Sequence, residues 1–190
     1  MRKIGLLLIA VMMILPAMAQ VSFGVRAGGA YSSLIQKVED TYEAGARFGF
    51  SIAGLADIPL SKNKKWSLRP EVAFVNQGGA YYSNQDIHGM ALHNKCWYYS
   101  LQIPVNVAYT FTFTDVHLSV FAGPTFDWSL KDLKPCDFGM NVGLSVEYSN
   151  FFFSVSSLCG MIDRRALKRD GETSVYQNNV TFSLGYYFRK

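Results

Sequence analysis

The chain has 190 residues, a size that suits one domain, and its net charge of +4 is small and scattered along the sequence. Such a charge argues against a nucleic-acid-binding protein, which would carry a concentrated basic patch. Past residue 20 no apolar run approaches the ~20 residues that a transmembrane helix needs, so a bundle of membrane helices is excluded as well.

The N-terminus has the pattern of a secretory signal peptide. Arg2 and Lys3 give a basic start, and the apolar run over residues 4–16 is too short to span a bilayer comfortably. The sequence at 17–19 (AMA) matches an A-x-A cleavage site. We expect residues 1–19 to be removed before Gln20, which leaves residues 20–190 as one outer-membrane barrel domain. An uncleaved membrane anchor is the alternative.

Eight segments alternate apolar residues with small or polar ones, a pattern typical of β-strands with two different faces. The fourth segment is the clearest, since Leu101, Ile103 and Val105 share one face while Gln102 and Asn106 share the other. In chain order the segments span residues 21–31, 44–57, 66–77, 96–112, 116–128, 137–148, 151–160 and 177–188.

Two residues interrupt this alternation. Pro70 cannot donate a hydrogen bond to a strand ladder, so we expect a local bulge there. Phe152 places an aromatic residue at a position where the pattern calls for a small or polar one.

The connections between the segments alternate in length. Those at 32–43, 78–95, 129–135 and 161–176 are long, whereas those at 58–65, 113–115 and 149–150 are shorter. Short periplasmic turns that alternate with longer outer loops are a mark of outer-membrane barrels. The sequence therefore predicts an all-β protein, an eight-stranded antiparallel up-and-down transmembrane β-barrel.

A soluble barrel would also alternate, so other features must decide which face points outward. Every lysine lies outside the eight segments, and aromatic residues gather toward the segment ends, as in interfacial belts. The polar face is rich in Gly, Ser and Ala, which suits a narrow lumen filled by side chains. These features favour lipid outside and a packed polar interior, in the outer membrane of a Gram-negative cell.

Charged residues on the polar face nearly balance in sign. We expect them to form a paired lumen network, because an unpaired buried charge is very costly. A structural polar plug is favoured over a selective ion path, since eight strands leave little room for a pore. The predicted network consists of Arg26, Arg47, Asp57, Arg69, Glu71, Asp127 and Glu147.

The sequence resembles the PorT-like outer-membrane β-barrel proteins of the Bacteroidota type. The resemblance covers most of the mature chain and rests on a series of motifs. They are FGVRAGGAYSSL at 23–34, residues 44–77 with their IPLS turn, YSLQIPVNVA at 99–108, VFAGP at 120–124, DFGMNVGLSVEY at 137–148 and VTFSLGYYF at 180–188. It implies an eight-stranded barrel in the outer membrane and no particular chemistry. One departure is that Phe188 is followed by Arg189 and Lys190, which displaces the terminal aromatic residue usual in such barrels.

Candidate chemistry is sparse. His88 and His93 share a predicted outer loop with Asp86 and Ser83, and a histidine beside a carboxylate could act as a general base. Nothing in the sequence brings these residues together, so solvated loop residues are the favoured reading and no catalytic residue is expected. His117 is expected to face the lumen. No cofactor or metal site is predicted.

The last long loop is strongly charged. Its basic residues could contact lipopolysaccharide phosphates or a partner protein, although a solvated loop is favoured. They are Arg164, Arg165, Lys168 and Arg169.

Three cysteines, an odd number, do not form a disulfide framework. We expect no obligatory disulfide, with Cys136–Cys159 favoured over any pair with Cys96 if one forms.

The sequence thus predicts a non-enzymatic outer-membrane protein, structural, adhesive or accessory to transport or secretion through its outer loops. Expected partners are outer-membrane lipid, lipopolysaccharide and an envelope protein, without nucleic acid. The alternatives are an outer-membrane lipid-modifying enzyme, a narrow ion or solute channel, and a soluble periplasmic barrel.

Overall fold

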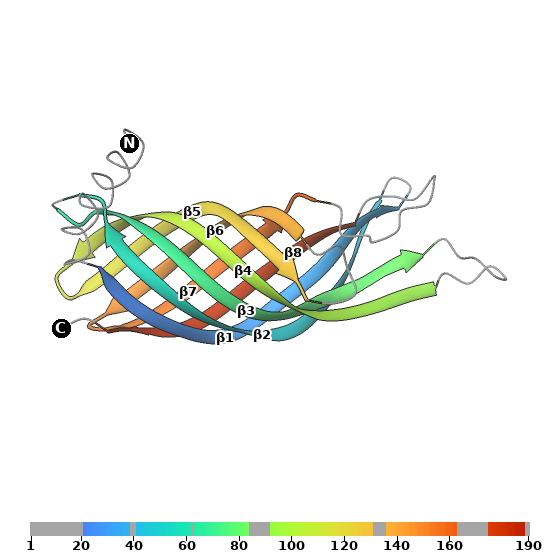
Figure 1. Cartoon of the computed structure of the whole chain (residues 1–190), viewed down its shortest axis with the longest axis horizontal. Coiled ribbons are helices and arrows are strands. Elements are labelled where there is room, and N and C mark those ends of the chain that lie inside the picture. Colours follow the sequence, from blue (N-terminus) through green and yellow to red (C-terminus); the bar gives the residue numbers. More distant parts are fainter. Residues whose placement is uncertain are drawn as a thin grey trace, which may run out of the picture.

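The computed structural model is a closed barrel of eight antiparallel strands (Figure 1). It describes residues 21–38, 41–61, 63–83, 92–130, 136–162 and 175–188. The strands are β1 (Ser22–Val38), β2 (Thr41–Pro59), β3 (Trp66–Ser83), β4 (Leu92–Phe113), β5 (Val116–Ser129), β6 (Cys136–Tyr148), β7 (Phe151–Gly160) and β8 (Val175–Tyr187). Each strand pairs with its neighbours in sequence, and β8 pairs with β1. The predicted eight-stranded up-and-down barrel is thus confirmed.

The described part of the chain contains no helix of the length and apolar character needed to traverse a membrane.

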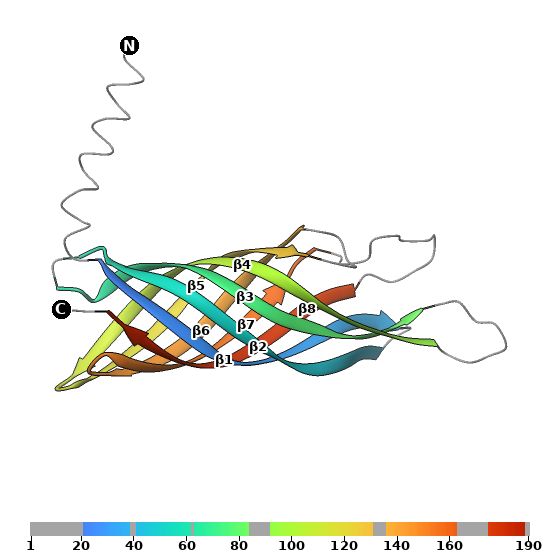
Figure 2. The same cartoon turned by 60° about the horizontal axis from the view of Figure 1, so that its bottom comes forward.

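The stagger between strands fixes their tilt. Starting at Ile58 of β2, we step from each residue to its partner on the next strand until the path has gone once around the barrel. The path returns to β2 at Phe48, ten residues from its start. For eight strands this stagger corresponds to a tilt of about 40° and an interior that side chains can fill. Figures 1 and 2 show the strands winding obliquely around the long axis of the barrel.

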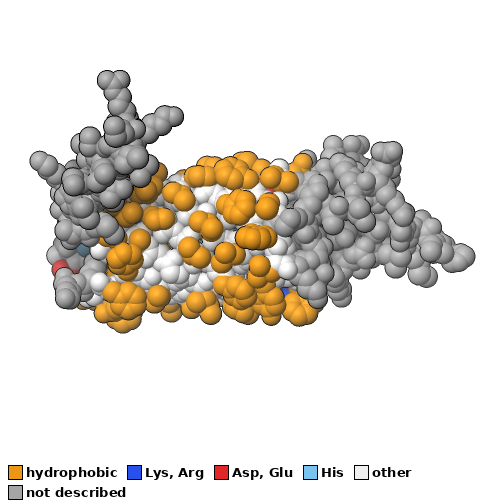
Figure 3. Space-filling view, viewed as in Figure 1, with side chains coloured by type: hydrophobic (Ala, Val, Ile, Leu, Met, Phe, Trp, Pro, Cys, Tyr) orange, Lys and Arg blue, Asp and Glu red, His pale blue; other side chains and the backbone are white. Residues whose placement is uncertain are grey.

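Alternation along each strand separates an apolar outer face from a polar lumen. In β6 every second residue is exposed, from Phe138 to Tyr148, while the residues between them, such as Asn141 and Ser145, point inward. Figure 3 shows the visible outer face covered by hydrophobic side chains between the two ends of the barrel. Small inward residues (Gly, Ala, Ser, Asn) allow the lumen to close, and large outward residues supply the surface that contacts lipid.

Aromatic side chains form a belt at each end of this apolar face. Around one end Trp66 contacts Tyr109, and Tyr186 contacts Phe151. Near the other end Tyr99 stacks on Phe74 with ring centroids 5.3 Å apart. The ten residue-to-residue steps from Tyr99 to Tyr109 rise about 25 Å along the barrel axis, because the strand is tilted ~40° from that axis. This rise matches the height of a bilayer-spanning apolar band. Among the described residues, no outward position between the belts carries a charge.

Tight turns join the strands at one end of the barrel. A residue with positive φ lies in each of the three turns there: Lys64 (54°), Thr114 (47°) and Ser149 (57°). The first residue of β1 and the last of β8 lie at this same end (Figure 2). Short turns face the periplasm in outer-membrane barrels, so we assign this end as inner and the opposite end as outer.

The first four strands extend well past the outer belt. They contain 17, 19, 18 and 22 residues, whereas β5 to β8 contain 14, 13, 10 and 13. The predicted long loops at 32–43 and 78–95 are therefore wrong, because strand pairing continues to Val38 and to Ser83. Beyond the membrane the outward face need not be apolar, so the alternation that reveals a strand is lost there. Figure 1 shows that β1 to β4 nevertheless continue as strands beyond the ends of the other four.

The bulge expected at Pro70 is also absent. Pro70 pairs with Val105 in an unshifted β3–β4 register, and β2 keeps one register with β3 on both sides of it. The register shift lies instead between Gly45 and Ser51 of β2, where one extra residue faces β3.

Candidate functional site

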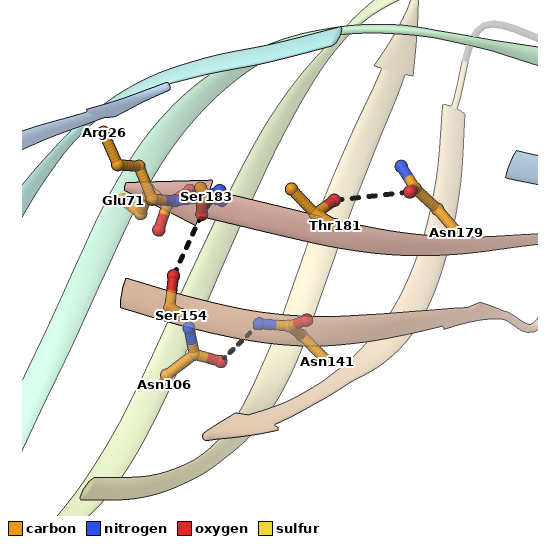
Figure 4. A network of polar contacts seen from close by, with 8 residues as sticks. All are labelled: Arg26, Glu71, Asn106, Asn141, Ser154, Asn179, Thr181 and Ser183. Atoms are coloured by element: carbon orange, nitrogen blue, oxygen red, sulfur yellow. Dashed lines mark hydrogen bonds and ion pairs between the residues drawn. The ribbon is translucent and has the colours of Figure 1, made fainter. Parts of the chain in front are cut away.

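An ion pair holds the middle of the lumen together. The Arg26 guanidinium of β1 pairs with the Glu71 carboxylate of β3, and its Nε donates to Glu71 Oε1 at 2.9 Å. Arg26 also donates to the Ser183 hydroxyl at 3.0 Å, which in turn lies 2.9 Å from the Ser154 hydroxyl (Figure 4). The pair therefore links four strands through charge-assisted and neutral hydrogen bonds.

A second ion pair lies closer to the inner end. Arg69 Nε donates to Asp57 Oδ1 at 3.2 Å, and the other guanidinium nitrogens reach Ser145 and Ser119 on the opposite wall at 3.3 and 3.1 Å. Glu147 is buried on β6 nearby, at the mouth that Arg69 and Asp57 also line. The Arg69 side chain thus crosses the lumen and hydrogen-bonds to residues of β2, β5 and β6.

An amide-rich cluster occupies the outer half of the lumen. The buried Asp127 carboxylate accepts hydrogen bonds from the side-chain nitrogens of Gln77 and Gln102, both at 2.8 Å. Asn179 donates to Gln77 Oε1 at 3.1 Å, and Thr181 donates to Asn179 (Figure 4). This cluster joins β3, β4, β5 and β8.

Six of the seven residues predicted to form the lumen network lie inside the barrel. Four of them form two ion pairs, Asp127 belongs to the amide cluster, and Glu147 lies near the Arg69–Asp57 pair. Arg47 lies elsewhere: its guanidinium stands 5.3 Å from the ring centroid of Trp97, an exposed residue at the outer belt. The backbone of Arg47 still pairs with the inward Ser32, as alternation predicts, but beside the β2–β3 register shift its guanidinium reaches Trp97 and Asn76.

Aromatic residues fill part of the inner half. Phe152 and Tyr187 lie in the lumen with ring centroids 4.7 Å apart and pack with Leu55. The break in alternation at Phe152 is therefore a lumen-filling residue. The sequence signal that could have revealed it is Gly185, its cross-strand partner, which leaves space for the ring.

β1 and β3 come into direct contact toward the outer end of the lumen. The Ser32 hydroxyl of β1 donates to the backbone oxygen of Gly78 in β3 and accepts from its N–H, both at 2.8 Å. A Cβ at Gly79 would lie 2.7 Å from the backbone nitrogen of Leu34, so two glycines let β3 approach β1 across the lumen. Tyr98, which is 1% exposed, lies buried at the same level. We call Ser32, Leu34, Gly78, Gly79 and Tyr98 the outer seal.

The described residues enclose a small cavity and a larger vestibule. The cavity between the Arg26–Glu71 pair and Phe152 has a volume of about 30 Å³, room for one or two water molecules. A vestibule of about 400 Å³ opens at the inner end, lined among others by Asp57, Lys64 and His117. His117 Nδ1 lies 3.2 Å from the Thr112 hydroxyl, at the mouth rather than in the interior.

Most loop candidates lie outside the described residues. These are Asp86, His88, Arg164, Arg165, Lys168 and Arg169. Ser83 and His93 belong to β3 and β4, whose outermost side chains are likewise outside the description. The described residues contain no group of three or more His, Cys, Asp or Glu side chains that could hold a metal ion.

The cysteines that can be placed lie apart. Cys136 and Cys159 are both exposed and free, and Cys159 pairs with Met140 in the β6–β7 ladder. Cys136 therefore lies four residues beyond the position opposite Cys159. The side chain of Cys96 is outside the description.

No curated protein sequence matches the chain. Among solved structures, it is similar to Neisserial surface protein A, at 13% identity and a TM-score of 0.51 over 88% of this chain and 99% of that one. It is also similar to the outer membrane protein OprG from Pseudomonas aeruginosa, at 13% identity and a TM-score of 0.50 over 89% of this chain and 96% of that one. A major outer membrane protein from Thermus thermophilus gives 12% identity and a TM-score of 0.53 over 89% and 100% of the two chains. At these identities the likeness shows the fold alone.

The family is shown by the sequence itself. The model of a family described as outer membrane protein beta-barrel domain matches residues 17–133, which is more than half of the chain. Together with the lipid-facing apolar band and the two aromatic belts, this match shows that the chain belongs to the outer membrane protein beta-barrel domain family and resides in the Gram-negative outer membrane.

Proposed function

We propose that the chain is a closed, non-enzymatic barrel that acts through contacts made by its extended outer hairpins, as a structural, adhesive or secretion- and transport-accessory protein. The observation that carries the proposal is the outer seal, in which β1 contacts β3 across the lumen. The small volume of the cavity beneath the seal supports a lumen without a continuous path for a hydrated solute.

The unequal strand lengths support a role at the outer rim. β1 to β4 continue as paired hairpins past the outer belt, and a paired hairpin presents residues in a fixed arrangement at little entropic cost. An envelope protein or the lipopolysaccharide layer is the proposed contact partner, and the charged segment with Arg164, Arg165, Lys168 and Arg169 is proposed to contribute. We also propose that the chain belongs to the PorT-like subgroup and that residues 1–19 are a cleaved signal peptide, with 20–190 as the mature barrel domain.

Conductance in a planar bilayer tests closure. We expect no steady single-channel current from the folded protein, under conditions in which an open porin inserted by the same procedure conducts. Tyr98→Ala, which empties part of the outer seal, should give brief openings if the seal is the barrier. A stable current through the unmodified protein would favour the narrow channel instead.

Photo-crosslinking tests the outer contacts. A photoreactive residue at position 94, on the outer extension of β4, should yield crosslinks to a defined envelope protein in intact cells. The same residue at position 63, in an inner turn, should not yield that product. The absence of any product from several outer positions would contradict a partner-binding role.

The rival enzyme is tested by lipid hydrolysis. We expect no fatty acid release from phospholipid vesicles, for the unmodified protein as for His88→Ala and His93→Ala. Turnover that disappears in either variant would overturn the non-enzymatic reading.

A further inference from the structure

The Arg47 side chain at the outer belt suggests a specific lipid contact, which deepens the lipid contact proposed above but does not depend on an envelope protein partner. We propose that Arg47, held by Trp97 and Asn76, binds the phosphate group of an outer-leaflet lipid whose head group is anionic.

The guanidinium of Arg47 is fixed in place by three contacts. It lies over the Trp97 ring at 5.3 Å, a cation–π geometry. Its Nη2 donates to Asn76 Oδ1 at 3.3 Å, and its Nε donates to the backbone oxygen of Phe48 at 3.3 Å. A guanidinium that is already oriented loses less entropy when it binds an anion.

The strand irregularity explains why a charged residue reaches the surface here. Residues 46–50 of β2 face residues 76–79 of β3 without forming regular ladder pairs. A Cβ at Gly49 would lie 1.9 Å from the Asn76 backbone oxygen. Glycine is therefore needed at this position, just before regular pairing of β2 with β3 resumes at Ser51. The local bend lets Arg47 contact Trp97, which faces outward and is 58% exposed.

The charge on Arg47 has no acidic partner among the described residues. Arg26 and Arg69 are paired with Glu71 and Asp57, whereas the contacts of Arg47 are an amide oxygen, a carbonyl oxygen and an aromatic ring. All three are neutral, and the remaining guanidinium N–H groups are available to an anion. Arginine suits phosphate because its planar fork can donate two parallel hydrogen bonds.

The position of Arg47 at the outer belt favours a lipid phosphate over a soluble phosphate. Trp97 is two residues closer than Tyr99 to the outer end of β4 and lies on the same face of the strand. The two ring centroids are 6.2 Å apart, so Trp97 belongs to the outer belt. Belt residues lie at the level of lipid head groups. Phe48, which is 77% exposed beside Arg47, offers apolar surface to an acyl chain. A lipid phosphate satisfies both features, while a soluble phosphate would use only the charge.

Quenching of Trp97 by brominated lipid tests the proposal. Replacing Trp66 and Trp128 with Phe leaves Trp97 as the single tryptophan. The protein is folded into phosphatidylcholine vesicles that contain a minor fraction of phosphatidic acid brominated near the head group, or the same fraction of brominated phosphatidylcholine. Because an exposed ion pair contributes up to about 1 kcal/mol, we expect phosphatidic acid to be enriched about two- to fivefold next to Trp97.

Three variants separate the charge from other effects. Arg47→Gln should remove the enrichment, Arg47→Lys should keep part of it, and Lys64→Gln, at the inner turn, should leave it unchanged. Folding of each variant is checked by its heat-modifiable gel migration, and the comparison of the two lipids with Arg47 intact needs no variant at that position.

Equal quenching by the two lipids, or enrichment that survives Arg47→Gln, would overturn the proposal. Inorganic phosphate at millimolar concentration should not reverse the quenching. If it does, the site binds soluble phosphate and the lipid assignment is wrong.

Discussion

Gly185 of β8 pairs directly with Phe152 of β7, and a Cβ on Gly185 would lie 2.2 Å from the Phe152 ring. The ring occupies the space that a side chain at 185 would need, so the aromatic filling of the inner lumen depends on this glycine. The break in alternation at Phe152, which is visible in the sequence, therefore reflects how the inner lumen is filled.

Gly185→Ala should therefore destabilise the barrel. Forcing an extra methyl group against a packed ring costs about 1–3 kcal/mol. The matched control is Gly29→Ala, since a Cβ there meets no atom within 4 Å and faces outward. Reversible unfolding by urea in lipid vesicles measures both. Equal effects of the two substitutions would show that the Phe152 ring is not constrained by Gly185.

The Arg26–Glu71 pair should behave as a coupled unit. Replacing only Arg26 with Met leaves the Glu71 carboxylate buried without its cation, which costs about 3–5 kcal/mol. The double variant Arg26→Met/Glu71→Gln should recover more than half of that loss. A double-mutant cycle from unfolding free energies gives the coupling, and purely additive losses would mean that the ion pair does not stabilise the fold.

The lipid-facing side of the barrel should reject charge. Val105 and Leu144 point outward near the middle of the apolar band, so Val105→Arg or Leu144→Arg should lower the folding free energy into bilayers by roughly 2–4 kcal/mol. Asn106→Arg should cost less if lumen carboxylates can supply a counter-charge, since Asn106 faces inward beside Asn141. The opposite ranking would contradict the assignment of inside and outside.

Much of the barrel can be predicted from alternation, because lipid outside and a packed polar interior impose opposite requirements on successive residues. In β4 the predicted faces of Leu101, Ile103 and Gln102 are the observed ones. The rule fails where that contrast ends. The paired extensions of β1 and β3 lie beyond the lipid, and nothing there requires an apolar face, so their sequences resemble loops.

The site was harder to predict than the fold. Placing Arg47 requires the register shift between Gly45 and Ser51, which depends on how two strands pair and not on the sequence of either one. The outer seal requires Gly78 and Gly79 to meet Ser32 and Leu34, a contact between strands that are not ladder neighbours. The alternation of residues within one strand predicts neither the position of the Arg47 guanidinium nor the contact between β1 and β3.

Barrel orientation can be checked by surface labelling. Tags placed near Asn84 or Asp170, which lie outside the described residues, should react on intact cells. A tag near Asn63, an exposed residue in the turn between β2 and β3, should react only after the outer membrane is permeabilised. Labelling at Asn63 in intact cells would reverse the assigned inner and outer ends, and with them the leaflet that Arg47 contacts.

The cysteines give the last test. Cys136 opens β6 and Cys159 lies near the end of β7, opposite Met140. Four residues of a strand at ~3.3 Å each separate the two levels by about 13 Å, whereas a disulfide needs Cα atoms within about 7 Å. We therefore expect three reactive thiols when the unfolded, unreduced protein is titrated. A single reactive thiol together with a Cys136–Cys159 peptide would show instead that the outer end of β6 folds back over the rim.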